Sequence, residues 1–348
     1  MTARETLTFA AVFVLAAVAV GLRAAAVEGQ AVFIVSAVAL MALAWLLGEA
    51  TDQAGDTAGP RASALLNATF GNLPEIVIVV LAIDAGLPDI ARASIIGSVI
   101  GNMLMILGLS LVLGGWRNGA QQFNERLASA NSSMLILAVA VLGIPTLFAH
   151  VHSGAHSVHL LSRWTAGAML VCYVAYVYYT FVTPDLRYRH QPAGATWTRT
   201  QAVMVLCLTA LATGVVSEVL VHSIEPAVRA WGVPRPFIGL VVVPFVGNVA
   251  EHFAAVRLAI RNSLDFSMGI AYGSGIQIAL AASGLAVFAS IALGSELSLV
   301  FPPLEIAALG AAALVSTLVA RGGETNWLEG LQLLTIYVVV AVAFWLLG

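Results

Sequence analysis

Two glutamates inside apolar stretches are the residues of this chain best placed to do chemistry. Glu75 ends the sequence Gly-Asn-Leu-Pro-Glu, and Glu251 ends Gly-Asn-Val-Ala-Glu. A charged side chain in the middle of a membrane span costs at least about 2.5–3.5 kcal/mol, so such residues usually serve a function. Asn72 and Asn248 lie three residues before the glutamates and would share a helix face with them. The two motifs therefore predict two carboxylate–amide pairs within a membrane.

Further oxygen atoms would complete a cation site. Pro74 and Pro244 have no amide hydrogen and clash with the carbonyl four residues earlier, so each frees a backbone carbonyl oxygen. Hydroxyl groups recur at matching places, in Ser98 and Ser274. A hard cation such as Ca²⁺ takes about six to eight oxygen ligands. The candidate metal ligands are Glu75, Glu251, Asn72, Asn248, Ser98, Ser274 and the carbonyls of Phe70 and Leu240.

The same carboxylates could also bind protons. When the cation is absent, burial and like charge disfavour the doubly ionised pair, so protons should bind in its place near neutral pH. If the empty, doubly charged site cannot be moved past the apolar barrier, only the protein with bound Ca²⁺ or bound protons can switch the side of the membrane to which the site is open. This restriction produces an antiporter.

Three further glutamates and several histidines each allow more than one interpretation. Glu49 and Glu218 occupy roughly matching places and could line a route for protons or ions; an interfacial carboxylate that reaches water is the other interpretation, for Glu49 above all. His252 could relay protons or merely support Glu251, and beside the site it leaves Mn²⁺ or Zn²⁺ open. Glu305 lies at the end of an apolar span, where a solvated carboxylate is expected. Four histidines between residues 150 and 159 indicate a solvated loop or, alternatively, weak metal capture.

The elements that position these residues are membrane spans. Of 348 residues 60% are hydrophobic and 9% are charged, with a mean hydropathy of +0.95, which excludes a soluble globular protein. The net charge of −3 makes no case for nucleic acid. Runs of about 20 apolar residues span a bilayer, and eleven are predicted: 7–22, 31–48, 64–83, 93–115, 130–148, 164–182, 202–221, 237–256, 267–293, 303–320 and 327–347.

An internal repeat relates the two glutamate motifs. Glu75 and Glu251 are 176 positions apart, and so are Gly97-Ser98 and Gly273-Ser274. An odd number of spans, five, separates equivalent points, so the second copy enters the membrane from the opposite side, as in many secondary transporters. We predict an all-α polytopic membrane protein of eleven transmembrane helices: an N-terminal helix (1–28), a five-helix repeat (29–182), a cytoplasmic linker (183–200) and an inverted five-helix repeat (201–348), with broken helices at the centre.

Arginine counts predict the orientation. With the N-terminus in the cytoplasm, ten of the fifteen basic residues, all arginines, face the cytoplasm, in agreement with the positive-inside rule. The C-terminus is then outside, and a bacterial inner membrane is expected. The first apolar run is also compatible with a signal peptide, because Arg4 precedes it and three alanines follow.

Several motifs in order resemble those of the Ca²⁺/H⁺ antiporters (cation/proton exchangers) within the Ca²⁺/cation antiporter superfamily. The sequence Gly-Asn-Val-Ala-Glu-His at 247–252 is similar to the second signature of that family, and 71–75 resembles the first; 97–108, 273–280 and 326–330 also resemble family segments. The resemblance implies eleven helices and cation binding by Glu75 and Glu251. It adds Asn102 and Gln277 to the polar surroundings. We assign these two residues, together with Glu49, Glu218 and His252, to the proton or ion path.

The resemblance implies a transporter, not an enzyme, with no cofactor and with Ca²⁺ and H⁺ as transported ions. The expected partners are these ions and the lipid bilayer; a homo-oligomer is compatible with the sequence. Pro74 is a departure, because a Pro-Glu pair is more similar to the Na⁺/Ca²⁺ exchangers, so a Na⁺-coupled or broad divalent exchanger, including Mn²⁺, stays the alternative. The stretch 183–200 holds one acid, Asp185, so regulation through an acidic helix does not carry over. An intramembrane metalloprotease is disfavoured because no H-E-x-x-H motif is present.

Overall fold

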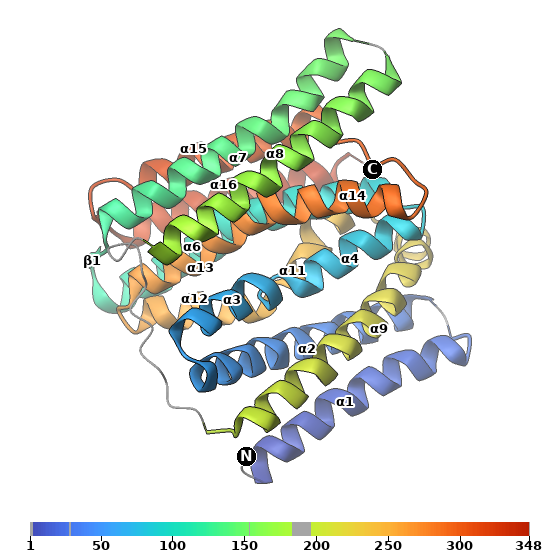
Figure 1. Ribbon diagram of the computed structural model, residues 1–348, viewed down its shortest axis with the longest axis horizontal. Helices are drawn as coiled ribbons and strands as arrows, with labels where there is room; N and C mark the ends of the chain where they lie inside the picture. Colours follow the sequence, from blue (N-terminus) through green and yellow to red (C-terminus); the bar gives the residue numbers. More distant parts are fainter. Residues whose placement is uncertain (1–2, 28, 153, 183–195, 348) are drawn as a thin grey trace.

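The chain is built almost entirely of helices, most of them running roughly parallel or antiparallel to one another (Figure 1). The computed structural model describes residues 3–27, 29–152, 154–182 and 196–347. Most of the predicted linker, residues 183–195, lies outside the described residues. The first half contains α1 (Ala3–Ala24), α2 (Gly29–Ala58), α3 (Pro60–Phe70), α4 (Leu73–Asp84), α5 (Pro88–Ile100), the π-helical turn η1 (Gly101–Ile106), α6 (Leu107–Asn118), β1 (Gln121–Gln122), α7 (Glu125–Val151) and α8 (Ala155–Val182).

The second half follows a similar order of helices, but its strand comes one helix later and it has an additional π-helical turn. It contains α9 (Arg199–Trp231), α10 (Arg235–Phe237), η3 (Ile238–Val242), α11 (Val243–Gly247), α12 (Val249–Ile260), α13 (Leu264–Gln277), η4 (Ile278–Ala282), α14 (Ser283–Ala292), α15 (Pro303–Val319), β2 (Glu324–Thr325) and α16 (Trp327–Trp345). The two short strands pair antiparallel, Gln121 opposite Thr325, and so join the connection before α7 to the connection before α16.

Helices occupy all eleven predicted spans, but not every one is long and apolar enough to count as a crossing. Within the described ranges, eight helices meet that criterion, and the bent pair Arg235–Gly247 and Val249–Ile260 makes nine. The α3–α4 pair falls short of it, and so does α15 with its 17 residues. The membrane-embedded helical fold is confirmed, while the count of eleven crossings stays a prediction.

The two halves run in opposite directions through the molecule. Figure 1 shows α4 extending from its break toward the end where the C-terminus lies, whereas α12 extends from its break toward the opposite end, near β1. Helices α2 and α9, which begin the two repeats, pack along each other, and α1 contacts both. This is the antiparallel arrangement that an inverted repeat requires.

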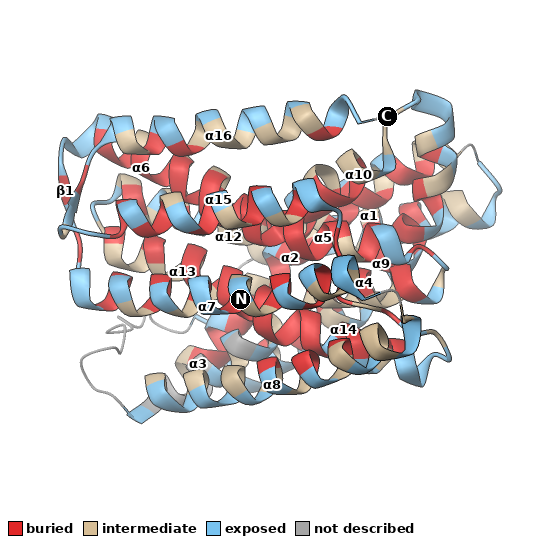
Figure 2. Ribbon diagram, turned by 90° about the horizontal axis from the view of Figure 1, so that it is seen from above, coloured by how far each residue is buried: buried red, intermediate tan, exposed pale blue. Residues whose placement is uncertain are grey.

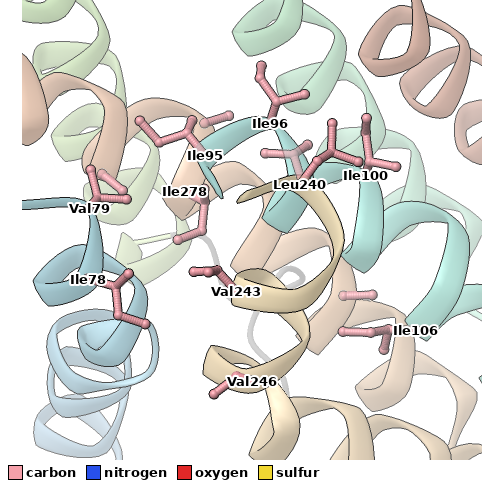
Figure 3. Packing of buried hydrophobic residues seen from close by; sticks show 14 of the residues in the cluster. Ile78, Val79, Ile95, Ile96, Ile100, Ile106, Leu240, Val243, Val246 and Ile278 are labelled. Carbon is pink, nitrogen blue, oxygen red and sulfur yellow. The ribbon is translucent and has the colours of Figure 1, made fainter. Parts of the chain in front are cut away.

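The core lies where the broken helices meet. In the most apolar stretch of the α5–α6 span 83% of residues are buried, against 22% in α1 and 17% in α16, so the broken spans are central and the outer helices face the surroundings (Figure 2). Buried side chains from α4, α5, η3, α11 and η4 pack against one another, among them Ile78, Ile100, Leu240 and Ile278 (Figure 3). This tight apolar packing fixes the helix breaks, and the breaks position the polar residues.

Candidate cation site

Both glutamate motifs lie at a helix break. Helix α3 ends at Phe70 and α4 begins at Leu73; α11 ends at Gly247 and α12 begins at Val249, with a bend of 64°. Asn72 and Asn248 cap the new helices with nearly the same backbone conformation, φ −107° and ψ 24° against φ −92° and ψ 9°. Glu75 and Glu251 therefore stand in the first turns of α4 and α12, where the partial positive charge of a helix N-terminus stabilises carboxylates.

Hydrogen bonds cross between the two halves in a matching pattern. The Ser274 hydroxyl donates to Oδ1 of Asn72 at 2.8 Å, and the Asn248 amide donates to the Ser98 hydroxyl at 3.4 Å. In each bond, the asparagine of one half meets the serine of the other. The amide of Asn102 also donates to the Ser274 hydroxyl at 2.8 Å. The repeat thus brings together five polar side chains that the sequence predicted as neighbours.

The two carboxylates lie close to this network. Glu75 is 2% exposed and reaches toward the other half: a Cβ atom added to Gly247 would lie 2.7 Å from its Oε1. Glu251 lies within hydrogen-bonding reach of the Ser274 hydroxyl and close enough to Glu75 for the two charges to interact. The first and second halves therefore each contribute one acid to a single cluster.

Several buried oxygens of the cluster have no hydrogen-bond partner. They are both carboxylate oxygens of Glu75, Oε2 of Glu251, and the amide oxygens of Asn102 and Asn248. Buried acceptors without donors are costly, and a cation or a proton supplies what they lack. An all-oxygen set with two carboxylates suits a hard cation such as Ca²⁺.

Within the described part of the chain, soft-metal ligands are not assembled around this cluster. Among the described residues, no three His, Cys, Asp or Glu side chains are grouped so that they could hold a metal ion. This includes the histidines near residues 150–159: His150 bonds to the Thr146 carbonyl at 2.8 Å and His159 lies 3.7 Å from Glu296. The ring of His252 packs against that of Phe245, with centroids 5.4 Å apart.

The two predicted carbonyl ligands lie close to the breaks. Phe70 is the last residue of α3, and Leu240 lies within η3, four residues before Pro244. The Leu240 carbonyl is pressed against α5, because a Cβ atom on Gly97 would lie only 2.0 Å from this oxygen. Cation binding by these carbonyls stays a prediction.

The outer predicted residues differ in their surroundings. Glu49 is half-buried in α2, which contacts α12, and it accepts a hydrogen bond from Gln53 at 3.1 Å. Glu218 is half-exposed on α9 and pairs with Arg23 of α1 at 3.1 Å. Gln277 is buried at the end of α13, beside the cluster residue Ser274 in sequence. A role of Glu49 and Glu218 in a common path stays a prediction.

Three π-helical turns near the site did not follow from the sequence. The turn η1 begins at Gly101 and η4 begins at Ile278, within one residue of the repeat offset of 176; η3 carries Leu240. Such turns widen a helix by one residue and often mark functional sites. Apolar periodicity carries no signal for them, although the Gly97–Gly101 spacing marks the stretch as unusual.

Fold and site together define a class of protein. Two inverted halves, each with a broken helix that brings one carboxylate to a shared cluster, form the architecture of a secondary transporter of ions.

Comparison with known proteins gives the family. A family described as sodium/calcium exchanger protein matches residues 29–182 and 201–346, and the chain therefore belongs to this family. It is 38% identical over 323 residues to the Ca²⁺/H⁺ antiporter ChaA of Bacillus subtilis, covering 90% of this chain and 92% of that protein. It is 33% identical to a Ca²⁺/H⁺ antiporter of Synechocystis, with 90% of each chain covered.

Solved structures agree with this assignment. The crystal structure of the Ca²⁺/H⁺ antiporter protein YfkE superposes with a TM-score of 0.84 at 34% identity, covering 98% of this chain and 99% of that one. An H⁺/Ca²⁺ exchanger structure, CAX, matches with a TM-score of 0.75 at 15% identity, covering 99% of this chain and 93% of that one, and supports the fold alone. The family resemblance inferred from the motifs is confirmed.

Proposed function

We propose that this protein exchanges Ca²⁺ for H⁺ across a membrane at one site shared by Glu75 and Glu251. The observation that carries the proposal is the pair of acids, one from each half, whose buried oxygens lack hydrogen-bond partners. Relatives at 33–38% identity that cover 90% of the chain are Ca²⁺/H⁺ antiporters, which favours protons over Na⁺ as the counter-ion.

Charge balance explains why the exchange is obligatory. A bound Ca²⁺ or bound protons neutralise the two carboxylates, and either loading gives the buried oxygens the partners that they lack. Removing both would leave two like charges in a desolvated site, which is strongly unfavourable. The site therefore switches between the two sides of the membrane only when it holds Ca²⁺ or protons.

The neighbouring polar groups hold the site in shape. Asn72, Asn248, Ser98 and Ser274 orient the two broken helices through the crossed hydrogen bonds. The carbonyls of Phe70 and Leu240 supply further oxygens when Ca²⁺ is bound. We assign Glu49 to the approach to the site, because its helix contacts α12.

The arrangement in the membrane follows the sequence prediction. The N-terminus faces the cytoplasm of a bacterial cell and the C-terminus the opposite side, with repeats over 29–182 and 201–348. The family matches over 29–182 and 201–346 support this division.

Transport by purified protein in liposomes tests the proposal. Wild type should take up Ca²⁺ when a pH gradient is imposed and should not when only a Na⁺ gradient is imposed. Glu75→Gln and Glu251→Gln should each abolish exchange, while Glu296→Gln, which removes a surface ion pair with Arg163, should not. Elution as a single species in gel filtration controls for folding.

Two results would count against the proposal. Uptake driven by Na⁺ alone would favour the sodium-coupled alternative. Undiminished transport by either glutamine variant would remove that residue from the site.

A further inference from the structure

The segment that leads into the second repeat packs against the first two helices of the chain. Trp197 is 3% exposed, and it lies two residues before α9, at the end of the molecule where α1 begins and α2 ends (Figure 1). Its ring meets that of Phe9 edge to face, with centroids 5.1 Å apart, and its indole nitrogen donates to Glu5 at 3.4 Å. Trp197 therefore fixes the start of α9 against α1.

Gln53 of α2 binds the backbone of this segment. The backbone amides of Thr196 and Trp197, the docked segment, both donate to its Oε1, at 3.0 and 3.3 Å. Its Nε2 donates to Oε1 of Glu49 at 3.1 Å, one helical turn earlier. Because an amide oxygen accepts hydrogen bonds and an amide nitrogen only donates them, the two backbone donors fix which way the amide of Gln53 faces. Its nitrogen is thereby held toward Glu49.

Glu49 lies beside one of the two site helices. The residue before it, Gly48, packs against Ala250: a Cβ atom added to Gly48 would lie 3.6 Å from the Cβ of Ala250. Ala250 in turn precedes Glu251 in the first turn of α12. A continuous series of contacts thus joins the docked segment to the helix that carries Glu251.

The bond from Gln53 positions the Glu49 carboxylate without cancelling its charge. An amide is neutral, and Glu49 forms no ion pair with any of the described residues. Its counterpart in the second half, Glu218, pairs with Arg23 at 3.1 Å, so the charge of Glu218 is offset. Of these two outer acids, Glu49 is therefore the one whose full charge can attract a cation.

Glu305 is not part of this series of contacts. The sequence predicted a solvated carboxylate at a span end, but that prediction is wrong: the residue is 3% exposed and its Oε2 has no hydrogen-bond partner. It is buried because the first turn of α15 packs against α5, and it lines a separate cavity of about 430 Å³ with Arg92 and Arg235. Within the described ranges, no hydrogen bond connects Glu305 to the Glu75–Glu251 pair.

We propose that Gln53 is a positioning residue for Ca²⁺ entry and that the docked segment holds it in place. Gln53 keeps the Glu49 carboxylate at the cytoplasmic approach to the central site, where its charge draws Ca²⁺ toward the Glu75–Glu251 pair. Without the docked segment the amide of Gln53 is free to turn, and Glu49 loses its donor. The inference rests on the proposed Ca²⁺/H⁺ exchange and adds to it the residues that bring the cation to its site.

Uptake by everted vesicles tests this inference, because their outer face corresponds to the cytoplasmic side. The initial rate of Ca²⁺ uptake under a fixed pH gradient is measured against exterior Ca²⁺. Gln53→Met removes the hydrogen-bonding atoms of the side chain at similar volume. We expect half-saturating Ca²⁺ to rise about threefold, the effect of losing one hydrogen bond of ordinary strength, while the maximal rate changes much less.

A double-mutant cycle separates positioning from a merely structural role. If Gln53 acts through Glu49, then Gln53→Met should have no further effect once Glu49→Gln is in place, whereas a structural role would add its effect in either background. Where Glu49→Gln abolishes uptake, the same cycle is measured on Ca²⁺ binding to the purified protein by calorimetry.

Variants of the docked segment and its neighbour complete the test. Trp197→Ala should raise half-saturating Ca²⁺ as Gln53→Met does, whereas Trp197→Phe, which keeps the ring contact with Phe9, should stay close to wild type. Thr198→Ala is the matched control, because it removes the capping bond to the Gln201 amide at the start of α9 without touching Gln53. It should lower the melting temperature and leave half-saturating Ca²⁺ unchanged.

The outcomes separate this inference from the proposed function. Unchanged half-saturating Ca²⁺ in Gln53→Met, a rise of the same size in the Glu49→Gln background, or an equal rise in Thr198→Ala would overturn the inference. If Gln53→Met fails to fold, Trp197→Ala measured in the same two backgrounds decides the question. Absence of proton-driven uptake in the wild type would instead overturn the proposed function.

Discussion

At the scale of single residues, the two halves contribute matching groups with unequal geometry. The bond from Ser274 to Asn72 is 2.8 Å long, and its counterpart from Asn248 to Ser98 is 3.4 Å long. Ser274 also accepts from Asn102 and lies within reach of Glu251. The Ser274 hydroxyl therefore interacts with more polar groups than the Ser98 hydroxyl does, although the two serines are equivalent in the repeat.

This inequality predicts unequal effects of two equivalent substitutions. Ser274→Ala leaves several buried polar groups without a partner, each at a cost of about 1–3 kcal/mol, so we expect half-saturating Ca²⁺ to rise about tenfold. Ser98→Ala removes only the longer bond and should raise it about threefold or less. Ca²⁺-dependent uptake by the two variants measures this difference, and an effect of Ser98→Ala equal to or larger than that of Ser274→Ala would speak against the geometry described.

At the scale of elements, the equivalent contacts of the two broken spans also differ. Gly97 of α5 meets the backbone of η3 closely, whereas its repeat counterpart, Gly273 of α13, has no atom within 4 Å of an added Cβ atom. The helix packing around these two equivalent glycines is thus unequal. In an inverted repeat, exchanging these two arrangements would expose the site to the opposite side.

The difference can be tested by adding one methyl group at each position. Gly97→Ala forces α5 away from η3, and overpacking of this kind costs about 1–3 kcal/mol, so the melting temperature of the purified protein should fall. In Gly273→Ala the added methyl group meets open space, so the melting temperature should stay nearly unchanged. Equal melting temperatures for the two variants would show that the close contact at Gly97 does not stabilise this conformation.

At the scale of the whole molecule, the sequence predicted the membrane class, the repeat and the central residues. Glu75, Glu251 and their asparagines could be found because charge is rare in apolar spans and because the offset of 176 links two motifs. The π-helical turns and the burial of Glu305 could not be predicted, because both depend on how α5, η3 and α15 pack together. Periodicity within one span carries no information about its neighbours.

The predicted orientation can be measured with single cysteines. After Cys172 and Cys207 are replaced by alanine, Trp116→Cys and Glu296→Cys place a thiol at exposed positions, 82% and 54% exposed in the native residues. A membrane-impermeant maleimide should label Glu296→Cys in intact cells and Trp116→Cys only in everted vesicles. The reverse pattern would invert the assigned topology.

The central claim is that Ca²⁺ and protons occupy the same pair of carboxylates. Purified protein in a weakly buffered solution should release protons when Ca²⁺ is added, because the cation displaces them from Glu75 and Glu251. A sensitive pH electrode or calorimetry in buffers of different ionisation enthalpy measures this release. We predict proton release by the wild type and none by the Glu75→Gln, Glu251→Gln double variant; Ca²⁺ binding by the wild type without any release of protons would contradict the account.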